Sequence, residues 1–64
     1  MELVEVKKSL NKPVSFREKK YTLRACVIRK NDNGYYYQAE IVDKSGNSSI
    51  ICGLDEIEKV VSDD

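Results

Sequence analysis

The sequence predicts an α+β fold that is mostly β: an antiparallel β-meander of three central strands plus short N-terminal strands, with one short C-terminal helix. Between residues 21 and 51, apolar and polar residues alternate with the period of two that half-buried strands show. Two polar turns that end in glycine divide this stretch. From residue 54 to residue 61 the apolar residues recur at helical spacing instead. Residues 1–64 form a single domain, which can close into a small SH3-like open barrel.

The N-terminal strands are short. Residues 3–7 are predicted as an edge strand, because leucine and valine dominate them. Pro13 then interrupts any ladder, since proline has no N–H to donate. Residues 14–16 are predicted as a second strand that turns through residues 17–20 into the meander. One helical turn is the alternative, because Ser15 to Glu18 fits a capping box.

The first central turn, residues 31–34, sets the register of its hairpin, and a slip of one residue exchanges the two faces of the sheet. A two-residue loop places Val27 opposite Glu40, whereas a three-residue loop places Val27 opposite Ala39. We predict the three-residue loop, with Gly34 at positive φ and the side chain of the first turn residue capping the turn. The predicted interior then comprises Leu23, Ala25, Val27, Ala39 and Ile41.

The second turn, residues 43–46, has the same form and the same predicted geometry. This geometry places Ile51 opposite Ala39 and leaves Ile50 and Cys52 on the outer face. A two-residue loop would bury Ile50 and Cys52 instead, and the sequence leaves both registers open.

The preferred registers produce a candidate partner-binding surface on the outer face of the sheet. It consists of Ile28, Val42, Ile50 and Cys52. A thin domain seldom leaves such an apolar patch bare, so something should cover it. The N-terminal strand with Val14 and Phe16 covers it in one interpretation, and a partner protein or a second copy covers it in the other.

The composition argues against several classes of site. The chain has no histidine, which excludes a Cys-His or Ser-His pair, and its carboxylates at residues 55–58 suit a solvated surface. Cys26 and Cys52 are too few for a zinc site. They are expected roughly two strand spacings apart, about 9.6 Å, beyond the ~7 Å that a disulfide spans. We therefore expect reduced thiols, no metal, no cofactor, no catalysis and a cytoplasmic protein.

Charge is divided between the two halves of the chain. Residues 1–30 carry nine Lys and Arg against three Glu, and residues 31–64 carry two Lys against eight Asp and Glu, so 9 − 3 = +6 and 2 − 8 = −6. Such asymmetry indicates either a basic contact surface or halves that neutralise one another within a monomer or across a dimer. No signal peptide and no apolar run of about 20 residues is present, so we expect no membrane contact.

These observations predict a small non-enzymatic intracellular interaction module that binds a partner protein or forms a homodimer. Its size alone also suits an accessory protein of a phage or mobile element. The alternative function is binding of single-stranded nucleic acid, in which bases stack on an aromatic ring and cations meet phosphates. The candidate residues for that alternative are Arg24, Arg29, Lys30 and Tyr36. Ordinary cross-strand packing also explains them, and Glu40 and the zero net charge count against phosphate binding.

Overall fold

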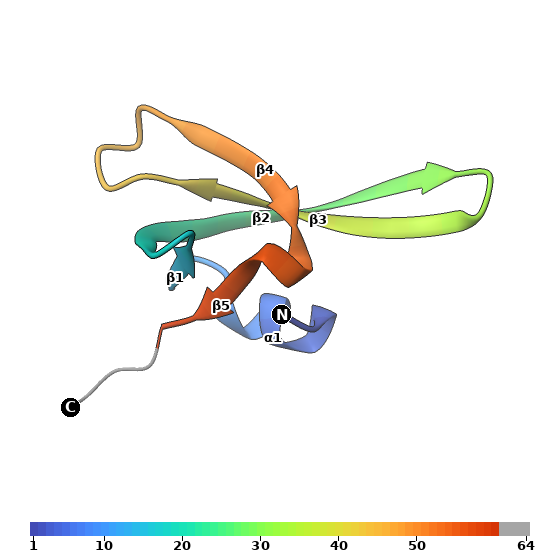
Figure 1. The fold of residues 1–64 in the computed structure, drawn as a ribbon, viewed down its shortest axis with the longest axis horizontal. Helices are drawn as coiled ribbons and strands as arrows, with labels where there is room; N and C mark the ends of the chain where they lie inside the picture. Colours follow the sequence, from blue (N-terminus) through green and yellow to red (C-terminus); the bar gives the residue numbers. More distant parts are fainter. Residues whose placement is uncertain (61–64) are drawn as a thin grey trace.

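The computed structural model describes residues 1–60, which form a mostly β fold with one short α-helix, as predicted (Figure 1). The elements in chain order are α1 (Leu3–Ser9), β1 (Pro13–Phe16), β2 (Lys19–Asn31), β3 (Gly34–Val42), β4 (Ser49–Gly53), the 3-10 helix η1 (Leu54–Glu56) and β5 (Ile57–Lys59). One antiparallel sheet holds all the strands in the order β4-β3-β2-β1-β5. Because β2 pairs first with β1 and then with β3, and η1 returns the chain to β1, β4 and β5 form the two edges of the sheet. The closure into an SH3-like open barrel stays a prediction. Together with α1 the sheet packs around one core, and we call this part of the molecule the body.

The N-terminal segment is helix α1, so the predicted edge strand over residues 3–7 is wrong. The N–H of Val6 donates to the Glu2 carbonyl at 3.0 Å and closes the first turn. Val6 and Ser9 are buried at a spacing of three residues, and Lys7 and Lys8 occupy the last turn, where the helix dipole favours cations. So short a helix is unstable alone, and its contact with the core outweighs the β propensity of valine.

The hairpin of β1 and β2 confirms the predicted strand over residues 14–16, and the capping-box alternative is not formed. Phe16 pairs with Lys19, so the loop consists of Arg17 and Glu18 alone. Both loop residues have positive φ, 51° and 68°, as a type I′ turn requires. This turn follows the right-handed twist of its strands and brings β1 back against β2.

A β-bulge at Arg24 corrects the predicted register of β2 against β3. The register shifts between Leu23 and Ala25. Beyond the shift, Ala25 pairs with Glu40 and Cys26 pairs with Ala39. A bulge inserts one extra residue, so the side chains that follow change faces.

The predicted interior is therefore only partly right. Leu23, Ala39 and Ile41 are fully buried, as predicted. The prediction is wrong for Ala25 and Val27, which lie on the outer face of β2 and are half-buried there. The bulge thus moves the core positions of β2 from odd to even numbers.

The turn between β2 and β3 has neither of the two loops considered from the sequence. Asn31 pairs with Gly34, which leaves Asp32 and Asn33 as the loop. Gly34 has a φ of +124°, a conformation that favours glycine, and the N–H of Asn33 donates to the Asn31 side chain at 2.8 Å. The predicted cap and the predicted positive φ are both confirmed, but the loop is one residue shorter than predicted.

The hairpin of β3 and β4 adopts the second of the two registers left open by the sequence. Ile41 pairs with Ile50 and Ala39 pairs with Cys52, so Ile50 and Cys52 face the core. The loop over residues 43–48 is held by Asp43, whose carboxylate accepts from the Ser45 hydroxyl at 2.8 Å. This bond lowers the pKa of the exposed Asp43 carboxyl.

The predicted C-terminal helix over residues 54–61 is wrong in its described part, and residue 61 lies outside the described residues. η1 is a single short turn, in which the Glu56 carboxylate accepts from the Gly53 N–H at 2.8 Å. Ile57 then begins β5 and pairs with Phe16 of β1. Pairing with β1 supplies the backbone partners and the core contact that an isolated helix at this end would lack.

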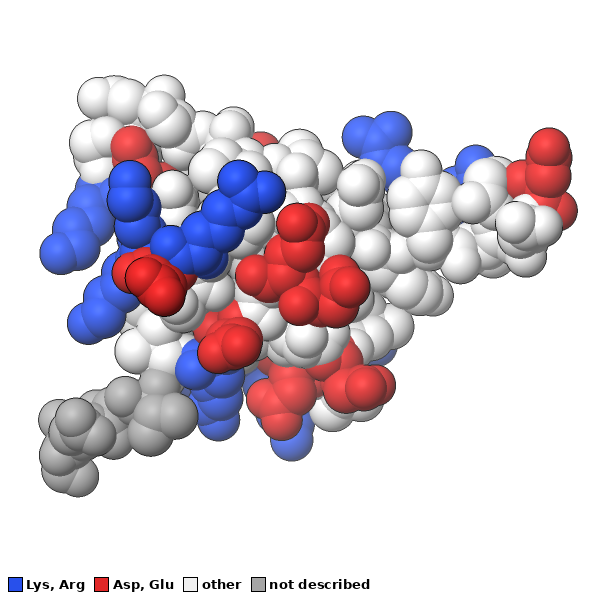
Figure 2. All heavy atoms as spheres, viewed as in Figure 1, with Lys and Arg blue, Asp and Glu red and all other residues white. Residues whose placement is uncertain are grey.

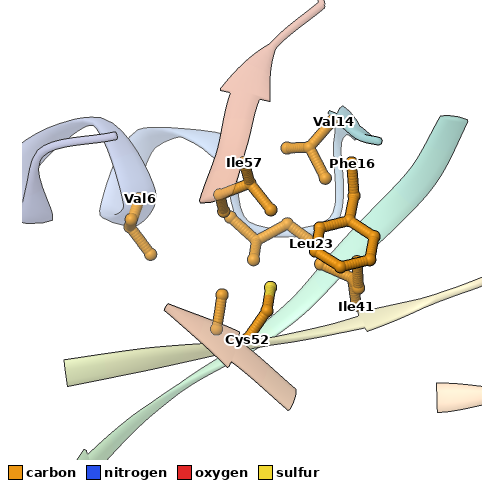
Figure 3. Packing of buried hydrophobic residues seen from close by; sticks show 8 residues of the cluster. Val6, Val14, Phe16, Leu23, Ile41, Cys52 and Ile57 are labelled. Atoms are coloured by element: carbon orange, nitrogen blue, oxygen red, sulfur yellow. The ribbon is translucent and has the colours of Figure 1, made fainter. Parts of the chain in front are cut away.

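The core lies between the curled sheet and α1, and every strand contributes to it (Figure 3). The buried apolar side chains are Val6, Val14, Phe16, Leu23, Ala39, Ile41, Cys52 and Ile57. Met1 packs against this cluster, and its amino group donates to the Leu54 carbonyl at 2.6 Å. This bond joins the N-terminus to η1 beside the core.

The opposite charges of the two chain halves lie close together in the fold. Figure 2 shows basic and acidic side chains beside one another on the viewed face of the body. β1 pairs Ser15 with Glu58 of β5. Arg17 and Glu56 both lie near enough to Cys52 to act on its pKa. Basic and acidic groups therefore share one face of a single copy, and neutralisation between the two halves stays a prediction.

The thiols of Cys26 and Cys52 are free. Cys26 in β2 and Cys52 in β4 both pair with Ala39 of β3, so β3 separates the two cysteines. Burial raises the pKa of the Cys52 thiol above its ordinary value of 9.0, and the nearby Glu56 carboxylate adds to the effect. The raised pKa means that the folded state favours the protonated Cys52 thiol. The contribution of this thiol to the stability of the folded state is therefore fully present below pH 9.0 and is lost as the pH rises through the pKa of the folded state.

We expect iodoacetamide to alkylate Cys26 at least about tenfold faster than Cys52 in the native protein at pH 8, because thiolate fraction and access set the rate. Tryptic mass spectrometry of a labelling time course measures both rates. In 6 M guanidinium chloride the two rates should converge. Equal rates in the native protein would contradict the burial of Cys52.

Candidate functional site

The far half of the β2–β3 hairpin projects from the body as an arm (Figure 1). We define the arm as residues 28–37, because β4 pairs with β3 only from Gln38 onward and β1 pairs with β2 only up to Thr22. The long dimension of the molecule, 42 Å against 25 and 18 Å, runs along it. Within the described part of the chain, β2 and β3 pair only with each other over the arm.

The face of the arm that continues the core side of the sheet is apolar and exposed. Ile28 pairs with Tyr37, and Lys30 pairs with Tyr35. The exposed fractions are 64% for Ile28, 68% for Tyr35 and 38% for Tyr37. The Lys30 ammonium lies 5.7 Å from the centroid of the Tyr35 ring, within the range of a cation–π contact. We call Ile28, Tyr35 and Tyr37 the aromatic face.

The opposite face of the arm is more polar. Tyr36, which is 40% exposed, pairs with Arg29. The Nε of Arg29 donates to the Gln38 side chain at 2.6 Å, which fixes the guanidinium alongside the strand. In Figure 2 the arm is mostly uncharged, with basic groups along one margin and an acidic group at its tip.

The structure does not assemble the predicted partner-binding surface of Ile28, Val42, Ile50 and Cys52. Cys52 is buried in the core, and Ile50 packs against it. Val42 is half-buried at the other end of β3, on the outer face. Ile28 alone is largely exposed, and it lies on the aromatic face. The register of β4 and the bulge in β2 account for the difference.

The residues of the nucleic-acid alternative are split between faces. Arg29 and Tyr36 lie together on the polar face of the arm, whereas Lys30 lies with Tyr35 on the other. Arg24 is exposed at the bulge, outside the arm. Two of the three predicted cations thus lie beside tyrosines, but on opposite sides of the ribbon.

Tyr35 and Tyr37 were not predicted as site residues, because their odd positions place them on the core side of β3, with Ala39 and Ile41. Both do lie on that side, but beyond the reach of β4 and β1. A signal was available in the strand lengths. The alternating runs that became β2 and β3 have 13 and 9 residues, whereas β4 has only 5, so part of the hairpin must extend past its neighbours.

Few features among the described residues suit bound small molecules. No pocket is found in residues 1–60, and no group of three or more histidine, cysteine or acidic side chains is placed to hold a metal ion there. None of the helices in that range has the length and apolar character needed to cross a membrane. The arm is therefore the strongest candidate for a functional surface.

No family model, no curated protein and no solved structure matches the chain.

Proposed function

We propose that the protein is a non-enzymatic, cytoplasmic interaction module that binds a partner protein through the aromatic face of its arm. The observation that carries the proposal is the exposure of Ile28, Tyr35 and Tyr37 on a two-stranded ribbon that no third strand within residues 1–60 covers. Tyrosine supplies a large contact area at a low cost in conformational entropy and is enriched at binding hot spots.

The shape of the arm supports the same conclusion. An isolated two-stranded hairpin is only marginally stable in water, so a long projecting ribbon adds little to the stability of the fold. A binding role accounts for its length. Its apolar side chains lie close together across the ribbon, with Ile28 directly opposite Tyr37. A ribbon of this kind fits into a groove of a partner, and each exposed side chain gains contacts on docking.

A capture experiment with matched variants tests the proposal. The tagged protein is used as bait in extracts of the source organism, beside an Ile28→Ser/Tyr35→Ser variant and a Val4→Ser control. Val4 is an exposed apolar residue of α1, away from the arm. A protein retained by the wild type and by the control should lose about 30-fold or more in affinity for the arm variant, since two truncated contact residues at over ~1 kcal/mol each cost about 2 kcal/mol together.

Thermal unfolding of all three proteins accompanies the capture, and we expect the variants to stay within about 0.5 kcal/mol of the wild type because the changed side chains are exposed. Binding that is equal for the arm variant and the control, at equal stability, would contradict the proposal. So would the absence of any protein that depends on the aromatic face.

The arm also favours a second candidate function, binding of single-stranded nucleic acid. Its cations Arg29 and Lys30 lie beside Tyr36 and Tyr35, and Asp32 is its one acidic residue. Stacking of bases on such rings, with phosphates near the cations, requires this combination. Retention on a dT oligonucleotide that falls steeply with salt, and falls further for Arg29→Gln/Lys30→Gln, would support it. Failure to bind at low salt would remove it.

A further inference from the structure

The two edges of the sheet are protected to different degrees. β5 is short and carries Glu58 and Lys59, and charged side chains on a short strand discourage pairing with another chain. β4, at the other edge, has no charged residue between Ser49 and Gly53. Nothing pairs with its outer side among the described residues. β4 is therefore an edge to which another strand can add, whereas the charged side chains of β5 disfavour such pairing.

The backbone bonds of the β3–β4 hairpin show which groups β4 presents at this edge. In an antiparallel ladder, pairs that exchange backbone hydrogen bonds alternate with pairs that exchange none. The N–H of Asp43 donates to the Ser48 carbonyl, so these two residues are a hydrogen-bonded pair. The pair two residues further along each strand, Ile41 with Ile50, therefore also exchanges backbone bonds within the hairpin. Ser49 and Ile51 then direct their N–H and C=O groups away from β3.

A second observation agrees with this direction. The N–H of Gly53 donates to the Glu56 carboxylate rather than to β3. Gly53 has the same parity as Ser49 and Ile51, so all three point outward. The side chain of Ile51 is 45% exposed on the outer face of the sheet.

We infer that β4 pairs antiparallel with β4 of a second copy, about a two-fold axis at Ile51. In this arrangement the Ile51 residues exchange both backbone bonds, and each Ser49 N–H donates to the carbonyl of the other copy's Gly53. Ile51 lies beside Ile51 on the outer face, and Ile50 lies beside Cys52 on the core side. No charge meets a like charge, so the edge is complementary to itself.

The pairing joins two five-stranded sheets into one continuous sheet. Because each arm projects beyond the end of β4 where Gly53 lies, the two-fold axis directs the two arms to opposite ends. The interface is small, so we expect half of the chains to pair only at about 0.1–1 mM. This inference does not depend on the proposed function of the arm.

Sedimentation equilibrium over a concentration series tests the inference, with Ile51→Lys as the disruptive variant and Val4→Lys as its control. Both replace an exposed β-branched apolar residue by lysine, but only Ile51 lies on β4. The wild type and Val4→Lys should rise from 7.3 kDa towards twice that mass. Ile51→Lys should stay at the monomer mass, because two lysines would face each other at the axis.

Amide hydrogen exchange gives a second, residue-specific readout. In the wild type, protection of the Ile51 amide should grow at least about tenfold between dilute and concentrated samples, while the inward-facing Ile50 amide stays protected throughout. A mass fixed at 7.3 kDa up to about 1 mM, or an Ile51 amide whose exchange ignores concentration, would overturn the inference. Equal association of Ile51→Lys and the wild type would do the same.

Discussion

Substitution of Val6 by lysine is expected to unfold the protein. Val6 is fully buried in the core between α1 and the sheet. An unpaired ammonium there costs several kcal/mol. A domain of this size with a single core has about 3–5 kcal/mol of stability in total. Circular dichroism and the dispersion of amide signals in a ¹H–¹⁵N spectrum at 25 °C measure the loss directly.

The matched control is Val4→Lys, which lies two residues away in the same helix. Val4 is 61% exposed, so its replacement should change the unfolding free energy by less than about 0.5 kcal/mol. In a strand, Val4 and Val6 would share one face and the two substitutions would act alike. Equal effects of the two lysines would therefore contradict the helix at the N-terminus.

The substitution Leu23→Ala should have the second largest effect. Leu23 is fully buried and sits next to the bulge, where β2 passes from its pairing with β1 to its pairing with β3. Removal of a buried leucine side chain costs about 2–5 kcal/mol, which approaches the whole stability of the domain. Urea unfolding followed by circular dichroism should show a transition moved to, or below, the start of the titration.

Val27→Ala serves as the comparison for Leu23→Ala. The register predicted from the sequence alone places Val27 in the core, whereas the bulge places it half-buried on the outer face. We expect a cost of about 1 kcal/mol or less. A cost for Val27→Ala as large as that for Leu23→Ala would show that the bulge is absent.

The central strands were predictable because half-buried strands alternate visibly, as β2 before its bulge and β3 do, and because β4 follows a polar turn that ends in glycine. The bulge was not predictable, because residues 25–28 are apolar at both parities and fit either face. The turn chemistry at Asn31 and Gly34 was predicted correctly, but the loop length was not. The extra residue between the paired positions lies at the bulge in β2 and not in the turn.

The two ends of the chain were mispredicted for a different reason. Residues 3–9 carry leucine and valines that suit a strand, and only the contact of Val6 with the core makes them a helix. The apolar residues within 54–60 have helical spacing, but Ile57 pairs with Phe16 and begins strand β5 on the free side of β1. Such choices depend on distant segments, which local pattern does not report.

The candidate site was predicted only in part. Ile28, Tyr36, Arg29 and Lys30 were singled out, and all four lie on the arm. Their grouping was wrong because it followed the predicted register. The projection of the arm depends on where β1 and β4 end, which is a property of the assembled sheet.

The most direct test of this account is the cross-strand contact map of the β2–β3 hairpin, measured by nuclear Overhauser effects on the labelled protein. The structure predicts contacts of Cys26 with Ala39 and of Ile28 with Tyr37, and no long-range contact between Tyr35 and the body. The Val27 side chain directly opposite Ala39 would show that the bulge is absent. Contacts of Tyr35 with core residues would place the tyrosines against the body and leave the protein without an exposed aromatic face.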